Sequence, residues 1–450
     1  MGESTDINDL QDGVLESNLD AISIVQRGNL KTLEKTLRKQ WRLGQNIVLC
    51  WSSDERGLLV ILVPHYFLGN YCAMDSTGNT DDNEVFVRDL ISGQRRKSRE
   101  ELFAVAERLD ISPTFIKLSS ALAEDDKVLG AVEELIRRYG LSFVETRAVL
   151  LFDIASFSLF TPFEQASQLN SLSYSLNSAY NKLQARGIEI NFARTTTGDG
   201  YYVWNRDLGP FSSQDLFLFM LLVVADNATA RAASRGNTVP VIRTAFHIGS
   251  HYELYQAEGV NPTVFSYIVG DVTIELARMV DLAQPHQVLI GDFECTLPSR
   301  ERGGAPLLFK VDSGAYVRSC DRELERLVGT PLSGKPISTM ACYLTGTQSG
   351  AGDPEPRRFR ITDKHGLTRY AYNLQVDIDL DGQTLALGLD PSQLPGRVAV
   401  GGAAVEEPPP VVEHSAAIET VDNTAQTAEA MFDDLASMLR KRATKTITED

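Results

Sequence analysis

The chain has 450 residues and a formal net charge of −17, with 43% hydrophobic and 23% charged residues. This length predicts two or three domains, and the composition is that of a globular protein with a buried core. The negative charge argues against a surface that binds nucleic acid or anionic membranes, because phosphates would be repelled. Small anionic ligands would then need metal ions.

Residues 1–15 are acidic and polar, so we expect a flexible leader and no signal peptide. The longest apolar run, Leu216 to Ala225, is shorter than the ~18–20 residues that span a bilayer. This run favours a buried helix and no membrane span. The five cysteines are scattered and odd in number, which is typical of reduced thiols. We therefore expect a cytoplasmic protein.

Residues 16–140 are expected to form an α/β N-terminal region with a regulatory or dimerising role. Apolar residues at helical spacing run from Leu19 to Trp41. Two strand-like runs, Ile47–Trp51 and Leu58–Pro64, predict a hairpin, and Asp75–Glu84 an acidic loop. The region therefore begins with a helix followed by paired strands.

Three helix signals follow in the same region. Ser98 and Glu101 form a capping box, and Ser112-Pro113 indicates an N-cap followed by proline at the first helical position. A further helix is expected over Val128–Tyr139, ending at Gly140. These helices lead to the next domain.

Strand and helix signals alternate across residues 146–291. In chain order they are a strand at Ala148–Phe152, a helix from Thr161 to Leu183, strands at Ile188–Thr195 and Tyr201–Trp204, a helix at Gln214–Ala233, a strand at Val239–His247, a helix at Val272–Ala283 and a strand at Gln287–Gly291. The order β-α-β-β-α-β predicts a ferredoxin-like α/β (α+β) fold.

The rest of the chain is less regular. Residues 292–400 are expected to form a β-rich extension, with strand regions at Thr339–Leu344 and Arg358–Ile378. Residues 401–415 contain a proline-rich linker, and residues 416–445 have apolar spacing suited to one amphipathic helix.

Two aspartates are candidates for chemistry. Asp153 ends the buried run LLFD, and Asp199 lies in the turn of TTTGDGYY. A carboxylate near a core needs a cation or hydrogen-bond donors, and two hard oxygen ligands suit Mg²⁺, which completes its shell with water and phosphate oxygens. The alternative is a turn role, above all for Asp199, because Asp-Gly is a favoured hairpin turn.

Four ordered segments resemble the motifs of class III nucleotidyl cyclases. LLFDIASFSLF resembles the first metal motif, and TTTGDGYYVW resembles the second, 46 positions later (199 − 153 = 46). VIRTAFHIGSHYELY resembles the following strand and turn, and YIVGDVTIELARMVDLAQPHQVLIGDF the final signature helix and strand. The resemblance covers about a third of the chain, and its four motifs in one register favour the metal role of both aspartates.

The resemblance implies an enzyme that converts a nucleoside triphosphate to a 3′,5′-cyclic mononucleotide and pyrophosphate, with two Mg²⁺ or Mn²⁺ ions per site. It also implies a homodimer in which the two subunits share each site. The implied residues are Asp153 and Asp199 with the Ile154 carbonyl for metal, the amides of Phe157 and Ser158 and, more loosely, Lys335 for phosphate, and Arg278 as the catalytic arginine.

Three positions depart from the family pattern. Ile274 stands where an asparagine usually binds the ribose, while Thr195 and Tyr267 stand where a lysine and an acidic residue read a purine. Neither Arg194 nor Glu275 is in register to replace that pair. The base-recognition residues Thr195 and Tyr267 therefore put ATP in doubt and leave a pyrimidine nucleotide as one hypothesis.

Two other readings stay open from the sequence. A catalytically silent cyclase-like domain would bind nucleotides or proteins, and a structural scaffold would bind no nucleotide. His247 and His251 are expected to pack rather than ligate metal, because two histidines without a third ligand make a poor zinc site. ITDKHG, at residues 361–366, is expected to be a polar turn.

Overall fold

The computed structural model describes residues 22–73, 80–258, 263–298, 308–348, 354–362 and 366–390. Outside these residues lie the leader at 1–15, the first residues of the helix expected over Leu19–Trp41, part of the acidic loop, the turn at 363–365, parts of the extension at 292–400, the linker at 401–415 and the helix at 416–445. The chain divides into the units Met1–Pro395 and Gly396–Asp450, and every described residue belongs to the first.

The N-terminal region is a three-stranded antiparallel sheet, ordered β1-β2-β3, with helices on both faces. Its elements are α2 (Ile24–Trp41), β1 (Asn46–Asp54), β2 (Gly57–Pro64), α3 (Phe67–Ala73), α4 (Thr80–Ile91), α5 (Arg99–Arg108), β3 (Thr114–Lys117) and α6 (Asp126–Arg138). Side chains alternate along β2: Leu58 and Val60 pack with α2 and α6, while Leu59 and Ile61 pack with α3, α4 and α5. Both faces of this small sheet are therefore buried.

The hairpin and three of the expected helices in this region, which are α2, α5 and α6, are confirmed. Ser98 caps α5 through the predicted capping box, and α6 ends next to Gly140. The helix predicted after Ser112-Pro113 is wrong, because β3 follows and pairs with β2 from Gly57 to Val60. Gly57 permits this close pairing, since a Cβ there would lie 1.9 Å from the Ile116 carbonyl oxygen. The acidic loop is wrong from Thr80 onward, where α4 begins.

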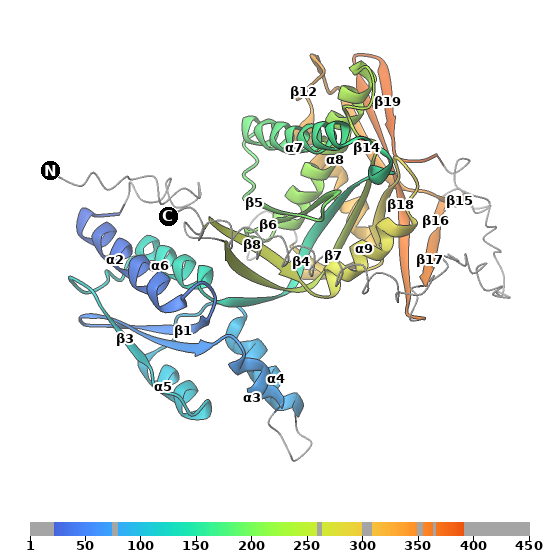
Figure 1. The fold of residues 1–450 in the computed structure, drawn as a ribbon. Helices are drawn as coiled ribbons and strands as arrows, with labels where there is room; N and C mark the ends of the chain where they lie inside the picture. The colour runs from blue at the N-terminus through green and yellow to red at the C-terminus, as the bar shows by residue number, and fades with distance from the viewer. Residues whose placement is uncertain are drawn as a thin grey trace, which may run out of the picture. The chain divides into compact units, whose positions relative to one another are not determined.

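The second region is built on the predicted β-α-β-β-α-β order. Its elements are β4 (Leu141–Ile154), the 3₁₀ turn η2 (Phe157–Leu159), α7 (Pro162–Ala185), β5 (Phe192–Thr196), β6 (Gly200–Asn205), α8 (Ser212–Ala233), β7 (Ile242–Glu258), β8 (Thr263–Val269), α9 (Asp271–Leu282) and β9 (Val288–Gly291). The strands lie in the order β9-β7-β4-β6-β5 within a larger sheet (Figure 1). The four ferredoxin-like strands β7, β4, β6 and β5 are antiparallel neighbours, so the predicted fold class is confirmed.

Helices cover both faces of this sheet. Leu150 and Phe152 of β4 pack with α7 and α8, whereas Val149 and Leu151 pack with α9. The two-residue alternation of a strand explains why one run of five apolar residues serves two cores. The apolar run ends at Phe152 and β4 ends two residues later at Ile154, which places Asp153 at the rim of the sheet.

The helix α8 contains the long apolar run. Among the described residues it is one helix that is long and apolar enough to cross a membrane, and 61% of its most apolar window is buried. All residues from Leu216 to Asn227 are buried. Phe217 packs edge-on against Phe246 of β7 and Tyr316. The run therefore lies in the core between the sheet and the following segment.

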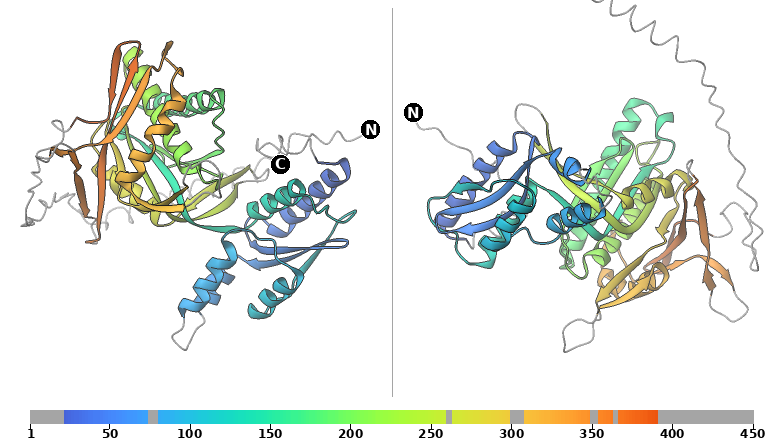
Figure 2. Two further views of the ribbon diagram at one scale, coloured as in Figure 1. Left: turned by 180° about the vertical axis from the view of Figure 1, so that it is seen from behind. Right: turned by 90° about the horizontal axis from the view of Figure 1, so that it is seen from below.

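Of the strands that follow, β14, β17, β18 and β19 extend the same sheet, while β10 and β11, β12 and β13, and β15 and β16 form three separate pairs. The elements are β10 (Glu294–Pro298), β11 (Leu308–Asp312), α10 (Ser313–Ser319), α11 (Asp321–Leu324), η3 (Glu325–Leu327), β12 (Pro331–Leu332), β13 (Lys335–Pro336), β14 (Thr339–Leu344), β15 (Gly346–Gln348), β16 (Pro354–Pro356), β17 (Arg358–Thr362), β18 (Thr368–Leu380) and β19 (Gln383–Leu387). β18 pairs with β9, and β14, β17 and β19 pair with β18. Figure 2 shows this C-terminal part of the described chain, in orange, as long strands at one edge of the molecule. The single strand region expected at Arg358–Ile378 is in fact two antiparallel strands.

Candidate active site

Strand register brings the two candidate metal aspartates together. β4 and β6 are antiparallel with Asp153 opposite Gly200, and the Ile154 amide donates to the carbonyl oxygen of Asp199 at 2.9 Å. A Cβ at Gly200 would lie 1.9 Å from the Phe152 carbonyl oxygen, so this position admits only glycine. The segment GDG thus lets the turn approach the end of β4 closely enough to place both carboxylates at one rim.

The turn itself supports Asp199 through local hydrogen bonds. The Thr197 amide donates to the Gly200 carbonyl oxygen at 3.0 Å, and the Thr197 hydroxyl lies 3.2 Å from Asp199 Oδ1. Gly198 has φ +102°, a left-handed conformation that favours glycine. Asp199 is therefore a turn residue whose carboxylate lies close enough to Asp153 to act on its pKa, and its role as a metal ligand stays a prediction.

Arg243, on β7, is the partner of Asp153 and was given no role from the sequence. Its Nε and Nη2 lie 2.8 and 2.5 Å from Asp153 Oδ2. Register explains the contact, because Asp153 faces Arg243 directly across the β4–β7 pair. The segment VIRTAF, which contains Arg243, was recognised in the sequence as a strand. Its contact with Asp153 could be predicted only with the register between β4 and β7.

The Asp153 carboxylate lies in an excess of negative charge. Burial raises its pKa to about 6, Arg243 acts in the opposite direction, and Asp199 and Asp281 raise it further. Each of these acidic neighbours disfavours the Asp153 anion and favours a cation close to it. Asp281 is a second residue that the sequence did not single out; it lies on α9 and joins the rim only through packing of that helix.

Two carboxylates and a backbone carbonyl of Ile154 are hard oxygen donors, and this donor set fits Mg²⁺ or Mn²⁺. Only Oδ2 of Asp153 is engaged by Arg243. Within the described ranges, histidine, cysteine, aspartate and glutamate form no cluster of three or more suited to a metal. The residues therefore suit an ion that takes its remaining ligands from water and a bound phosphate.

Arg278 lies on α9, one turn after Ile274. Its Nη1 is 3.3 Å from Asp281 Oδ2, and its side chain is about one-third exposed (33%). The fold does not bring it into contact with Asp153 or Asp199 among the contacts of the described residues. Arg278 instead reaches the rim indirectly, because its partner Asp281 is the residue that acts electrostatically on Asp153.

The expected phosphate-binding residues are divided between two places. Phe157 and Ser158 begin η2, three residues after β4 ends, and Ser156 before them has φ +57°. The first amides of a helical turn have no acceptor within the turn, so both can face an anion. Lys335 lies on β13, where its Nζ is 2.9 Å from Gln383 Oε1, and no contact of the described chain links it to the aspartates.

The expected base-recognition residues lie on adjoining strands. Thr195 is on β5 and Tyr267 on β8; both are half-buried, and the two strands contact each other. Ile274 is 47% exposed on α9. Glu275, one residue later, forms an ion pair with Arg369 of β18. Its carboxylate is therefore not available as a free acid to bind a base.

Arg194 is likewise engaged. Its Nη1 donates to the Ser173 hydroxyl of α7 at 2.8 Å, and its guanidinium lies 5.2 Å from the centroid of the Tyr201 ring. Arg194 is bound to Ser173 and Glu275 to Arg369, so neither charged neighbour of Thr195 and Tyr267 is free to bind a base. Thr195 and Tyr267 are therefore the groups to consider there.

The two histidines of β7 belong to the scaffold. Burial lowers the pKa of both His247 and His251 to about 4, so both are neutral near pH 7. His247 packs against Phe293 and over Gly291, where a Cβ would lie 2.0 Å from its Nδ1. His251 lies 3.3 Å from Arg147, whose Nη1 also pairs with Glu253 at 2.8 Å.

Comparison with known proteins gives structural matches only. No family model matches the sequence, and no curated protein matches it. A guanylate cyclase domain from Catenaria anguillulae, solved with GTP, matches at 15% identity and a TM-score of 0.27, over 38% of this chain and 98% of that one. The adenylyl cyclase CyaB from P. aeruginosa matches at 13% identity and a TM-score of 0.24, over 38% and 96%.

A bacterial light-regulated adenylyl cyclase matches at 12% identity and a TM-score of 0.25, over 40% of this chain and 98% of that one. These three similarities are thus to cyclase domains, and each covers about two-fifths of the chain. At such identities and scores it supports no conclusion about activity, which has to rest on the residues themselves.

Proposed function

We propose that this protein is a nucleotidyl cyclase that converts a nucleoside triphosphate to a 3′,5′-cyclic mononucleotide and pyrophosphate. The observation that carries the proposal is the pairing of Asp153 and Asp199 at one rim, from positions far apart in sequence, next to the amides of Phe157 and Ser158. Carboxylates and unpaired amides side by side suit a metal-bound polyphosphate.

Each residue of the rim has a task in that reaction. Asp153, Asp199 and the Ile154 carbonyl would hold two Mg²⁺ or Mn²⁺ ions, which supply activation of the ribose 3′-hydroxyl and neutralisation of the leaving pyrophosphate. The amides of Phe157 and Ser158 would orient the phosphates. Binding would require Arg243 to share or leave Asp153 Oδ2, since that guanidinium already neutralises the carboxylate.

Arg278 would stabilise charge on the α-phosphate in the transition state. In a single chain it is bound to Asp281 and does not contact the aspartates. A homodimer that presents Arg278 of one subunit to Asp153 and Asp199 of the other removes this difficulty. The exposed position of Ile274 on the same helix supports a subunit interface at this face of α9.

The base pocket would be formed around Thr195 and Tyr267. A hydroxyl and a phenol replace the lysine and acid of the usual purine pair, so charge-based reading of adenine is lost. The half-buried Tyr267 offers a ring face and a hydroxyl, which suit a smaller base. A pyrimidine nucleoside triphosphate is therefore the substrate that we would test first.

A silent nucleotide-binding domain is the second candidate, and one specific observation favours it. Ile274 places an exposed apolar side chain where a ribose-binding amide is expected, and it can donate no hydrogen bond. Such a domain would keep the aspartates for binding but would not turn over. Metal dependence separates the candidates: binding that requires Mg²⁺ or Mn²⁺ favours the enzyme, and metal-independent binding favours a sensor.

The test is to incubate the full-length protein with ATP, GTP, CTP and UTP separately, first with Mg²⁺ and then with Mn²⁺. Mass spectrometry would look for each cyclic mononucleotide. Asp153→Ala is the inactivated control, and Asp89→Ala, at an exposed position on α4, is the matched control for loss of one carboxylate. A product lost only in Asp153→Ala supports the cyclase; absence of product with all four nucleotides and both metals contradicts it.

A further inference from the structure

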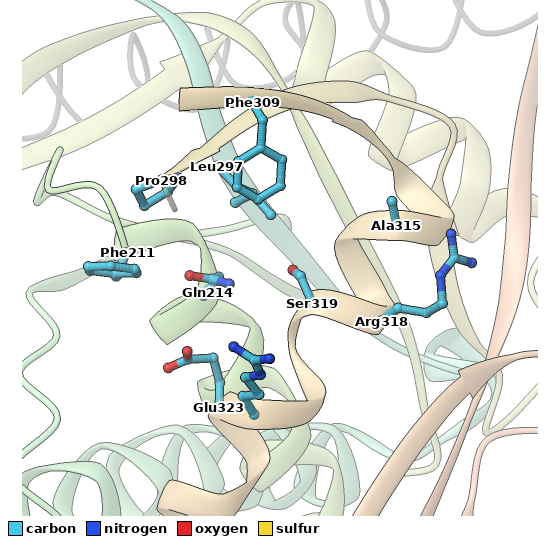
Figure 3. A pocket seen from close by; sticks show the side chains of 10 residues that line it. Phe211, Gln214, Leu297, Pro298, Phe309, Ala315, Arg318, Ser319 and Glu323 are labelled. Carbon is cyan, nitrogen blue, oxygen red and sulfur yellow. The ribbon is translucent and has the colours of Figure 1, made fainter. Parts of the chain in front are cut away.

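A partly open cavity of about 480 Å³ lies at the start of α8. It is bordered by the first turn of α8, the paired strands β10 and β11, and the helices α10 and α11 (Figure 3). No role in the proposed reaction uses this cavity. The residues that line it include two arginines, a buried side-chain amide and aromatic rings, which together could bind a ligand.

Gln214, in the first turn of α8, is the buried polar group of this cavity. The residue is only 5% exposed, and its Oε1 has no hydrogen-bond partner among the described residues. A buried acceptor without a donor is destabilising unless something supplies one. Figure 3 shows the Gln214 amide directed into the space between Phe211 and Ser319. A ligand with an N–H or O–H group would satisfy it.

Arg318 and Arg322 line the same cavity from α10 and α11. Neither forms an ion pair with an acidic residue within the described part of the chain, although Asp321 lies within electrostatic range of Arg318. The acidic residue that lines the cavity, Glu323, is bound to Arg326 at 2.9 Å. Figure 3 shows the Arg318 guanidinium beside Ala315, on the other side of Ser319 from Gln214. In a chain with net charge −17, two arginines that line one cavity favour an anion.

The remaining walls are apolar. Phe211 and Phe309 lie on different sides of the cavity, with Leu297 and Pro298 between them (Figure 3). Aromatic and aliphatic walls around a few polar groups are typical of small-molecule sites, where apolar contact supplies affinity and polar groups fix orientation. The site therefore suits a ligand with a flat apolar body as well as an anionic group.

This cavity is separate from the candidate active site. Gly200, opposite Asp153, begins β6, and Asn205 ends it; the Asn205 amide then reaches the Ser212 carbonyl oxygen at the start of α8 at 3.3 Å. The cavity at the start of α8 thus lies at the other end of β6 from the aspartates. A strand of this length separates two points by roughly 15–20 Å.

We propose that this cavity is a second, non-catalytic site for a small aromatic anion that carries a hydrogen-bond donor. Arg318 and Arg322 bind its carboxylate or phosphate, Phe211 and Phe309 contact its flat body, and Gln214 Oε1 accepts its N–H. An aromatic carboxylate and a nucleotide monophosphate share this chemistry, so the experiment includes one of each.

The experiment is isothermal titration of the full-length protein, in EDTA to keep divalent metals from the aspartates. The two anionic probes are indole-3-carboxylate and uridine 5′-monophosphate, and the neutral counterparts are indole and uridine. We expect one anion to bind at least about tenfold more tightly than its neutral counterpart, because a paired charge is lost with the acid group. Which anion binds identifies the kind of ligand.

Pocket variants locate that binding. The double variant Arg318→Gln/Arg322→Gln is expected to abolish the tenfold preference for the anion. The control is Arg235→Gln, an exposed arginine just beyond the opposite end of α8, which removes one positive charge, half of the change in the double variant, without touching the cavity. Binding of neither anion, or equal loss of binding in Arg235→Gln, overturns the proposal.

Gln214→Leu distinguishes a ligand-binding amide from a structural one. Removal of an unpaired buried oxygen is expected to raise the melting temperature of the free protein while weakening binding of the probe. A structural role predicts the reverse, a lower melting temperature with unchanged affinity. That result would also overturn the proposal, since the amide would then serve the fold alone.

Discussion

The two halves of the candidate active site differ in what holds them in place. The half that contains Asp153 and Asp199 is set by the β4–β6 and β4–β7 registers and by Arg243. The other half, with Ile274 and Arg278 on α9, lies on a helix face that is partly exposed. The aspartates are therefore held by contacts within a single chain, whereas the exposed face of α9 could contact a second subunit.

This difference is a consequence of how strands and helices present side chains. A strand fixed between two neighbours allows its terminal residue little freedom, because a slip of one residue would turn every side chain to the other face. A helix surface imposes no such register on exposed residues. We therefore expect changes at the strand rim to act on metal and stability, and changes on α9 to act on turnover and assembly.

The largest effect is expected from Asp153→Ala. Loss of a principal metal carboxylate should reduce cyclic-nucleotide formation by at least ~10³-fold, which is at the upper end of the cost of one charge-stabilising group. Initial rates at saturating nucleotide and Mn²⁺ would measure it. Asp89→Ala should keep the wild-type rate. An equal loss in both variants would mean that the carboxylate at the rim has no special role.

Arg278→Ala is expected to reduce the rate by ~10²–10³-fold, because transition-state charge loses its counter-charge. Mixed with Asp153→Ala after unfolding and refolding together, it should recover about a quarter of the wild-type activity, since half of randomly mixed dimers are heterodimers with one intact site. Recovery distinguishes a shared site from one within a chain.

The controls for that mixing are each variant refolded alone, and native mass spectrometry to prove that heterodimers formed. Heterodimers without activity would contradict the shared site and would place Arg278 and the aspartates of one chain in the same reaction centre.

Arg243→Met should change stability and metal binding in opposite directions. The mostly buried Asp153 loses its ion-pair partner, which costs about 3 kcal/mol of unfolding free energy. Mg²⁺ can replace the missing cation, so the melting temperature of this variant should rise more on addition of Mg²⁺ than that of the wild type. Scanning calorimetry with and without Mg²⁺ measures both.

Arg278→Met is the matched variant, because it removes an arginine from the exposed half of the site. Its melting temperature should change little, with or without Mg²⁺. A melting temperature of Arg243→Met that does not respond to Mg²⁺ would show that the rim does not bind the metal in the free protein.

The smallest effect is expected from Ile274→Asn. An amide at this exposed position can bind a ribose hydroxyl, and one hydrogen bond of about 0.5–1.5 kcal/mol corresponds to a rise in rate of roughly 2–12-fold. Stability should stay within about 0.5 kcal/mol, since the side chain is exposed. Rates of wild type and variant with the same nucleotide measure the gain. Ile274→Val, which adds no polar group, should leave the rate unchanged.

The N-terminal hairpin, the capping box of α5, the helix α7 from Thr161 and the strand–helix order of residues 146–291 could all be predicted from local pattern. Each depends on neighbours within a few residues: alternating apolar side chains, or a serine or threonine three residues before a glutamate. The same locality made the helix after Ser112-Pro113 wrong, because pairing with β2 outweighed the signal of the dipeptide.

Local sequence pattern was enough to single out the carboxylates proposed to bind metal and to place Asp199 in a glycine turn. Only the tertiary structure decided that Arg243 neutralises Asp153 and that Asp281 lies close enough to raise its pKa. It also decided that β18 continues the sheet beyond β9, and that Gln214 faces a cavity beside Arg318. These relations join residues about 80–130 positions apart, and a contact of that kind depends on strand order and helix packing, which no local pattern contains.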